Sequence, residues 1–539
     1  MNRPAIHRTA TTRLAAGALA ASVALLGLAV VAPPALASPE GARAGAATAT
    51  PGGEQRRPGW RFDESATTMA DVNRVIGADR LHQAGVDGSG VGVALVDTGV
   101  VPVPGLRDTH VVQGPDLSLE SQVPGLRHRD THGHGTHLAG IIAGRAGDGS
   151  GFTGVAPGAT LTSVKVGAAA GITDVSQVIA AIDWVVAHRN DDPARPIRVL
   201  SLSYGTDGTQ DYRLDPLTHA VENAWRAGIV VVTAAGNGGA SATQLANPAR
   251  DPFVIAVGAS DPRGTTRTAD DTVMDFSSRG DAARRVDLVA PGRSIVSLRD
   301  PGGFIDDMHP DARVGDRYTK GSGTSQAAAV VSGAVALLLQ QRPQLNPDQV
   351  KALLADSAAT LPQADPDGRG AGALDVRRAV TAAAVPPHAA QTWEPSTGRG
   401  SLEAARGSVH VALDGVVLSG ERDIFGPFDA AAWAAASSQG TAWDGGHWMG
   451  RPWTGDGWTA ESTSDPSWSG LSWSGLSWSG LSWSGLSWSG LSWSGLSWSG
   501  LSWSGLSWSG LSWSGLSWSG LSWSGLSWSG LSWSGDTWS

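Results

Sequence analysis

Between about residue 85 and residue 385, short apolar runs rich in valine and isoleucine alternate with amphipathic stretches. Five runs have the length and β-branched content of buried strands: Val91–Val96, Thr160–Val166, Val199–Ser203, Ile229–Thr233 and Phe253–Val257. The stretches between them predict helices: one with an apolar face from Val175 to Val186 behind a cap at Thr173 or Asp174, one near Thr324 and one over Pro347–Asp356. This alternation predicts an α/β fold, a three-layer, mostly parallel sheet with helices on both faces.

A tryptophan repeat follows this domain. Trp recurs from Trp433 onward, and from Trp468 to Trp533 it stands at every fifth position in the unit Ser-Trp-Ser-Gly-Leu. On an α-helix a spacing of five turns each Trp about 140° from the last, and on a straight strand it alternates faces. Gly and Ser favour an unfolded tail, whereas Trp and Leu favour stacking in a solenoid, and both interpretations stay open. We therefore predict a repetitive, low-complexity C-terminal tail over residues 443–539.

The N-terminal residues have the pattern of a secretory signal peptide. Three arginines precede an Ala/Leu/Val run over residues 14–31, and Ala35-Leu36-Ala37 forms a small-x-small cleavage pattern. We predict a signal peptide over residues 1–37 and a secreted, extracellular protein; a membrane anchor is the alternative, which the small residues disfavour. The remaining boundaries are a short disordered pro-segment or linker over 38–70, the domain over 71–385 and a connector over 386–442 with a weak β-pattern at Val409–Val417.

Composition narrows the chemistry. The net charge of −10 argues against nucleic acid or an anionic membrane as a partner. The chain has no cysteine, which excludes disulfides, thiolate catalysis and Cys-ligated zinc. Exposed faces among its 24 Trp would suit stacking on sugars, so contact with cell wall or polysaccharide is one prediction for the repeats. The alternative prediction is that the repeats bind no ligand.

Three short segments hold the candidate chemistry. Asp97 ends an apolar run before a glycine turn, at the sheet edge where ligands bind, although such an Asp is more often a turn former. His134 stands between His132 and His137, whose spacing is not that of the zinc helix motif, and we predict no metal ligand. Ser325 lies at the start of a predicted helix, where the dipole is positive; a plain N-cap is the alternative.

Together these side chains fit nucleophilic acyl transfer. The chemistry needs an alcohol, a base that takes its proton and a carboxylate that orients the base, and Asp…His…Ser is one known order of this triad. It also needs fixed hydrogen-bond donors for the oxyanion. Asn237, in the segment Ala-Ala-Gly-Asn-Gly-Gly after a predicted strand, is the candidate donor.

Over about residues 70–384 these segments resemble the subtilisin family of secreted serine proteases. The family's Asp motif is matched at 96–99 and its His motif at 134–140, with Leu138 in place of Val. Its Ser motif is matched at 323–327, with Gln326 in place of Met. The resemblance implies the subtilisin-like fold and a serine-type endopeptidase that acts on proteins or peptides.

The resemblance also implies roles for single residues. Ser325 would be the nucleophile, His134 the base and Asp97 the residue that orients it, with Asn237 and the Ser325 N–H as oxyanion donors. Ser203, Tyr204 and Gly205 would bind an extended substrate by β-strand addition.

The implied chemistry requires no cofactor. The family's strong calcium site uses an Asp about nine residues after the triad Asp, where this chain has Pro104-Gly105-Leu106. Asp148 lies in the other relevant loop, and one carboxylate is a poor calcium cage. A structural calcium ion is therefore left open.

Overall fold

The computed structural model describes residues 66–458, apart from 107–110, 122, 124, 146–150, 243, 409, 414–415 and 455–456. An eight-stranded sheet has the order β3-β4-β2-β5-β6-β7-β8, with β9 also paired to β7. All neighbours are parallel except β7 and β8. The strands are β2 (Gly92–Asp97), β3 (Val111–Asp116), β4 (Thr160–Lys165), β5 (Ile197–Leu202), β6 (Val230–Ala234), β7 (Ile255–Asp261), β8 (Thr272–Val273) and β9 (Leu288–Pro291). The five predicted strands are confirmed.

Helices cover both faces of the sheet. The chain passes from β2 to the edge strand β3 and then through α3 (His134–Ala143) to β4, which lies between them. It continues through α4 (Val175–His188) to β5 and through α5 (Pro216–Arg226) to β6, on the other side of β2. Helix α3 packs with α7 on one face of the sheet, and α4 packs with α5 on the other. The connection that follows β2 leads towards β3, and the connection that follows β5 leads the opposite way, towards β6. The carboxyl ends of β2 and β5 therefore flank a topological switch point, where open α/β sheets bind ligands.

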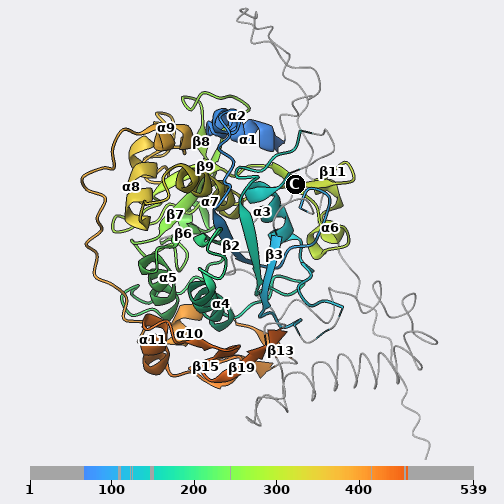
Figure 1. Cartoon of the computed structure of the whole chain (residues 1–539), viewed down its shortest axis with the longest axis vertical. Helices are drawn as coiled ribbons and strands as arrows, with labels where there is room; N and C mark the ends of the chain where they lie inside the picture. The colour runs from blue at the N-terminus through green and yellow to red at the C-terminus, as the bar shows by residue number, and fades with distance from the viewer. Residues whose placement is uncertain are drawn as a thin grey trace, which may run out of the picture. The chain divides into compact units, whose positions relative to one another are not determined.

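Helix α7 (Thr324–Gln341) packs beside α3 and against the middle strands of the sheet (Figure 1). Every residue from Thr324 to Leu339 is buried, because Ala, Val and Leu surround the helix on all sides. Strand β2 is buried at all six positions, as a central parallel strand must be. A buried helix and a buried central strand therefore carry the predicted nucleophile and the predicted triad carboxylate.

Shorter elements complete this part of the chain. A second sheet has the order β1-β10-β12-β11. Residues 67–70, which we predicted to belong to the pro-segment or linker, form β1 and the start of α1 because Met69 enters the core. The predicted signal peptide lies outside the described residues. The bounds are β1 (Thr67–Thr68), α1 (Met69–Val75), α2 (Ala78–Gln83), β10 (Ile295–Leu298), α6 (Phe304–Met308), β11 (Arg313–Val314), β12 (Tyr318–Gly321), α8 (Pro347–Ser357) and α9 (Val376–Thr381).

Beyond the predicted domain boundary, residues 396–448, here called the extension, pack against α4 and α5 (Figure 1). The sequence predicted only a connector with a weak β-pattern up to residue 442. The β13–β14 hairpin falls on that pattern, but the two helices were missed because their Ala-rich sequences are too short for a clear apolar face. The bounds are α10 (Leu402–Arg406), β13 (Ala412–Leu413), β14 (Val416–Val417), β15 (Arg422–Asp423), β16 (Gly426–Pro427) and α11 (Ala430–Ser438).

Tryptophan side chains hold the extension on α4. The indole N–H groups of Trp433 and Trp448 donate to Oδ2 of Asp183 at 2.8 and 2.9 Å, and the Ser437 hydroxyl donates to Oδ1 at 2.5 Å. The indole N–H of Trp443 donates to the Ala180 carbonyl at 2.7 Å. Trp433 and Trp448 are fully buried. These tryptophans are therefore core residues, and their rings are not available for stacking on a sugar.

A two-residue turn explains how a spacing of five fits strands. Gly445 and Gly446 have φ values of 52° and 87°, and Trp443 and Trp448 become register partners across this turn. Positive φ at both central residues is typical of a type I′ hairpin. Our sequence argument considered one straight strand and therefore did not include this arrangement; the perfect repeats from Trp468 onward lie outside the described residues. The strands here are β17 (Trp443–Asp444), β18 (His447–Trp448), β19 (Arg451–Thr454) and β20 (Gly457–Trp458).

The buried Asp183 carboxyl predicts a pH-dependent stability. Burial raises its pKa to about 6, against hydrogen bonds from Ser437, Trp448 and Trp433 that lower it. Because the folded state holds this proton more tightly than the unfolded state, the contribution of Asp183 to the free energy of unfolding is full below about pH 4 and is lost as the pH rises through about 6, by about 3 kcal/mol.

Urea unfolding of the wild type and of Asp183→Asn from pH 3 to pH 7 tests this prediction. The amide can accept both indole N–H groups but does not titrate, so the difference in unfolding free energy between the two proteins should move by that amount in favour of Asp183→Asn. An equal pH dependence in both proteins would contradict it.

Candidate active site

The predicted Asp and His meet at the switch point. Asp97 is the last residue of β2, and His134 is the first residue of α3. Nδ1 of His134 lies 2.8 Å from Oδ1 and 3.1 Å from Oδ2 of Asp97. Both side chains are buried, and exclusion of water strengthens the attraction between them.

A glycine permits this contact. A Cβ on Gly135 would lie 2.1 Å from the carbonyl oxygen of Gly99 and 3.0 Å from Oδ1 of Asp97. The first turn of α3 therefore rests directly on the turn after β2, and only glycine fits between them. This approach sets the distance between the imidazole and the carboxylate.

Asp130 fixes the start of α3, a role that the sequence analysis missed. Its carboxylate accepts hydrogen bonds from Gly133 N (2.7 Å), Thr136 N (2.7 Å) and the Thr98 hydroxyl (2.8 Å). The Thr98 oxygen in turn accepts from Gly135 N at 2.9 Å. One network thus ties the residue after Asp97 to the first turn of α3. The signal in the sequence is an acidic residue just before a helix start, which is typical of a cap.

The three neighbouring histidines have different surroundings. His134 faces Asp97, whereas the ring of His132 stacks on Phe304 at 5.7 Å between centroids. Burial and the charge of His134 lower the pKa of His137 to about 3, and burial lowers the pKa of His132 well below its usual range. Both are therefore neutral at pH 7. In the sequence, only the family motif distinguished His134 from the other two histidines. In the structure, its contact with Asp97 distinguishes it directly.

The Asp97 carboxyl is subject to opposing influences. Burial raises its pKa, and the charge of Asp130 adds to that effect. The charge and the hydrogen bond of His134 and the N–H of Thr98 lower the pKa. The ionised form of Asp97 therefore depends on these two neighbours, which is the coupling that a base-orienting carboxylate requires.

Ser325 and Asn237 are linked through one residue. Ser325 is the second residue of α7, directly after Thr324. Oδ1 of Asn237, in the loop after β6, accepts from the N–H and the hydroxyl of Thr324, both at 2.9 Å. With its oxygen held there, the amide N–H₂ of Asn237 is turned away from Thr324. The Asn237 side chain is thereby held in a fixed orientation beside the start of α7.

The predicted substrate-binding residues follow the carboxyl end of β5. The Ser203 hydroxyl donates to the carbonyl of Ser325 at 3.3 Å, which ties this segment to the start of α7. The Tyr204 side chain is only 1% exposed, so any substrate contact of Tyr204 falls to its main chain. Gly205 lies closely against Ala246, where a Cβ would lie 2.7 Å from the Ala246 methyl carbon.

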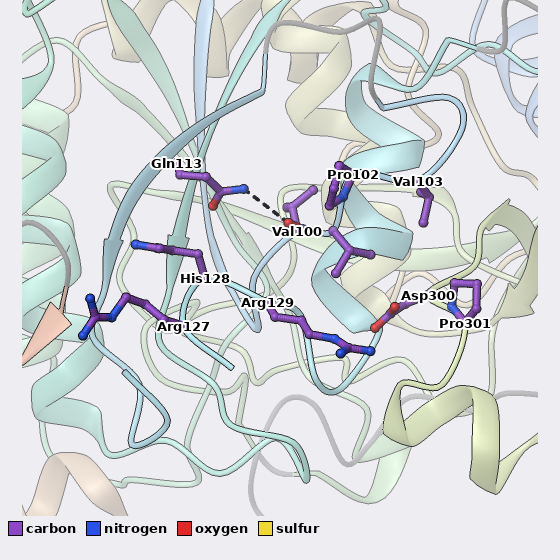
Figure 2. Close-up of a pocket in the computed structure, with 10 residues that line it drawn as sticks. Val100, Pro102, Val103, Gln113, Arg127, His128, Arg129, Asp300 and Pro301 are labelled. Carbon is purple, nitrogen blue, oxygen red and sulfur yellow. Dashed lines mark hydrogen bonds between the residues drawn. The ribbon is translucent and has the colours of Figure 1, made fainter. Parts of the chain in front are cut away.

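A cavity of about 520 Å³ lies beside the turn after Asp97 and was not predicted (Figure 2). Arg127 and His128 lie on one part of its wall, whereas the Arg129 guanidinium lies beside the Asp300 carboxyl (Figure 2). Burial and the charge of Asp130 raise the pKa of Asp300 to about 8, so this carboxyl is largely neutral at pH 7. The lining is Val100, Val101, Pro102, Val103, Gln113, Arg127, His128, Arg129, Asp300 and Pro301.

The described residues hold neither a cluster of metal ligands nor a membrane-spanning helix. Among the residues that the structure describes, no three His, Asp or Glu side chains are grouped to hold a metal ion. Gly105, which stands where the family's motif has its calcium-binding Asp, is buried, and Asp148 lies outside the described residues. Calcium binding stays an open prediction. No helix within the described ranges combines the length and the apolar character needed to cross a bilayer.

This chain is similar to known proteins over its α/β domain. Residues 88–378 match the model of the Subtilase family. The chain is 41% identical over 299 residues to the serine protease AprX of Bacillus subtilis (strain 168), which covers 54% of this chain and 66% of that protein. It is 33% identical over 299 residues to subtilisin DY of Bacillus licheniformis, covering 55% and 93%. The crystal structure of a cold adapted subtilisin-like serine proteinase matches 53% of this chain and 89% of that one, at 30% identity and a TM-score of 0.41.

The network at Thr98 predicts the effect of a nearly isosteric change. In Thr98→Val the N–H of Gly135 and one oxygen of Asp130 lose a buried partner, and we expect the free energy of unfolding to fall by about 1–3 kcal/mol. Thr98→Ser keeps the hydroxyl and should remain within about 1 kcal/mol of the wild type. Urea denaturation of the three proteins at one pH tests this, and equal stability of Thr98→Val and Thr98→Ser would refute the role of the hydroxyl.

Proposed function

This chain belongs to the subtilase family of serine-type endopeptidases, and we propose that it hydrolyses peptide bonds in proteins through a triad of Asp97, His134 and Ser325 and an acyl-enzyme intermediate. The observation that carries the proposal is the 2.8 Å contact between Asp97 and His134 at the carboxyl edge of the sheet. The extracellular location that we also propose is supported by the pattern of residues 1–37.

In the proposed mechanism, Ser325 attacks the scissile carbonyl while His134 takes the hydroxyl proton and later returns it to the leaving amine. Asp97 holds the imidazole with Nδ1–H towards the carboxylate, so that Nε2 acts as the base. The imidazolium formed in the first step is stabilised by the Asp97 charge, which is strongest in a buried site. In the second half of the reaction, water attacks the acyl-enzyme while His134 takes a proton from the water. His134 then gives this proton to the departing Ser325 oxygen.

The oxyanion of the tetrahedral intermediate would be bound by the side-chain N–H₂ of Asn237 and the main-chain N–H of Ser325. Support comes from the two hydrogen bonds that fix the Asn237 oxygen on Thr324. Donors fixed in advance need no reorganisation as the negative charge develops. The position of Ser325 at the start of α7 adds the positive end of a helix dipole.

Retention on cell wall or polysaccharide through the Trp repeats stays a prediction from the sequence. Trp443 and Trp448, the first two at the spacing of five, have their N–H groups bonded to α4. The proposal of glycan contact therefore concerns only later copies, and nothing in the extension favours it.

The nucleophile assignment predicts a covalent label. An organophosphonate should modify the wild-type protein at Ser325 in a 1:1 ratio and abolish hydrolysis of a chromogenic peptide. Ser325→Ala should resist labelling and lose at least about 10⁴-fold in kcat. Mass spectrometry locates the label, and the neighbouring Ser322→Ala variant is the control that keeps labelling. Full activity of Ser325→Ala would falsify the assignment.

The oxyanion assignment predicts a selective loss of kcat. Removal of one such donor costs about 10²- to 10³-fold in kcat in a protease of this family, and we expect that range for Asn237→Leu. KM should change by no more than about threefold, because the donor acts mainly on the transition state. Thr324→Val, which loses one of the two hydrogen bonds that orient Asn237, should fall between this variant and the wild type. A rise in KM with unchanged kcat for Asn237→Leu would contradict the role.

A further inference from the structure

We propose that Arg406 of the extension is a positioning residue for the substrate-binding segment, defined here as residues 203–208, an inference that rests on the proposed protease function. The segment is fixed near the catalytic residues at its start, where the Ser203 hydroxyl donates to the Ser325 carbonyl at 3.3 Å. Further along, Thr206 and Asn247 exchange two main-chain hydrogen bonds of 2.9 Å. What fixes the far end of the segment is the extension.

Helix α10 and the residues after it contact that far end directly. The Thr206 hydroxyl donates to the Ala405 carbonyl at 2.6 Å, and Ser408 N donates to the Asp207 carboxylate at 2.7 Å. A Cβ on Gly208 would lie 2.6 Å from a carbonyl oxygen of α10. The extension therefore lies against the main chain of the segment with no room for a further side chain.

Arg406 fixes α10 in this place. Its side chain is 1% exposed, and Nε donates to the Asp174 carboxylate at 2.6 Å. Nη1 donates to Glu403 at 3.0 Å and to the Gly420 carbonyl at 2.7 Å, and Nη2 donates to the Arg422 carbonyl. The planar guanidinium thus serves acceptors from α4, α10 and the chain around β15 at once. A lysine has one point charge and cannot serve them all.

The ion pair of Arg406 joins α10 to the start of α4. Asp174 caps α4 by accepting from Ser176 N at 2.9 Å, so its position is set by the protease domain itself. Burial raises the pKa of Tyr204, the charge of Asp174 adds to this and the charge of Arg406 opposes it. The Tyr204 phenol is therefore within electrostatic reach of the pair. Arg406 accordingly supports the segment through α10, at Thr206.

The effect of this support depends on the length of the substrate. β-Strand addition requires the main chain of the segment to match several substrate residues in register. A displacement of about 1 Å can cost on the order of 10²-fold in such a system. A single-residue ester makes no such register contacts and depends on the catalytic residues alone. Loss of Arg406 should therefore weaken binding of extended peptides and leave small esters unaffected.

The test uses the full-length protein with two substrates, a tetrapeptide anilide and a single-residue ester. In Arg406→Met we expect KM for the anilide to rise about 10-fold or more. The value of kcat/KM for the ester, and the rate of labelling by an organophosphonate, should stay within about twofold of the wild type. Thr206→Val removes one hydroxyl contact with α10 and should raise KM in the same direction if Arg406→Met does not fold, while Thr206→Ser should restore it.

Trp448→Phe is the matched control, because it loses a buried N–H contact of the extension with Asp183 that is remote from the segment. It should lower thermal stability without raising KM for the anilide. An equal rise of KM in Trp448→Phe and Arg406→Met at matched stability would overturn the positioning role, as would wild-type KM values in Arg406→Met and Thr206→Val. A wild type that hydrolyses neither substrate and takes up no label would instead overturn the proposed function.

Discussion

The contact between the first turn of α3 and the turn after β2 is the constraint on which the catalytic arrangement depends. A parallel sheet delivers Asp97 to its carboxyl edge, but the sheet alone does not bring a histidine to it. That task falls to a helix start with no side chain at Gly135 and with its free N–H groups bound by Asp130 and Thr98. The same hydrogen bonds that cap the helix therefore align the His134 imidazole, the proposed base, with the Asp97 carboxylate. Stability and catalytic geometry are here one set of interactions.

The α/β domain was accessible from the sequence because its signals are local. Apolar runs such as residues 91–96 can only be buried strands, and the all-apolar helix from Thr324 can only lie inside. The same local logic gave Thr173 or Asp174 as a cap, and the structure shows that Asp174 is the cap. Asp130 was not found, because the sequence drew attention to the histidines beside it and a capping carboxylate has no pattern of its own beyond its place before a helix.

The extension was not accessible because it has little local pattern. Helix α10 is five residues long, and the reason that it forms, the buried pair of Arg406 and Asp174, joins residues 232 positions apart. An arginine in a polar-looking connector resembles a solvated side chain until the fold supplies a buried acid for it. The Trp spacing misled for a related reason, since a two-residue turn reverses the chain and places Trp443 beside Trp448, an arrangement that a straight template excludes.

The Asp183 site also has a consequence for the order in which the molecule is made. Its three side-chain donors follow it in the chain by 250, 254 and 265 residues. At a synthesis rate of about 5–20 residues per second, the ribosome needs on the order of tens of seconds to produce them after Asp183 has left it. During that interval the α4 face presents an acid to solvent where the finished protein has an indole-lined core. A nascent protease of this design is thus incomplete until its C-terminal tryptophans emerge, and its maturation is timed by translation.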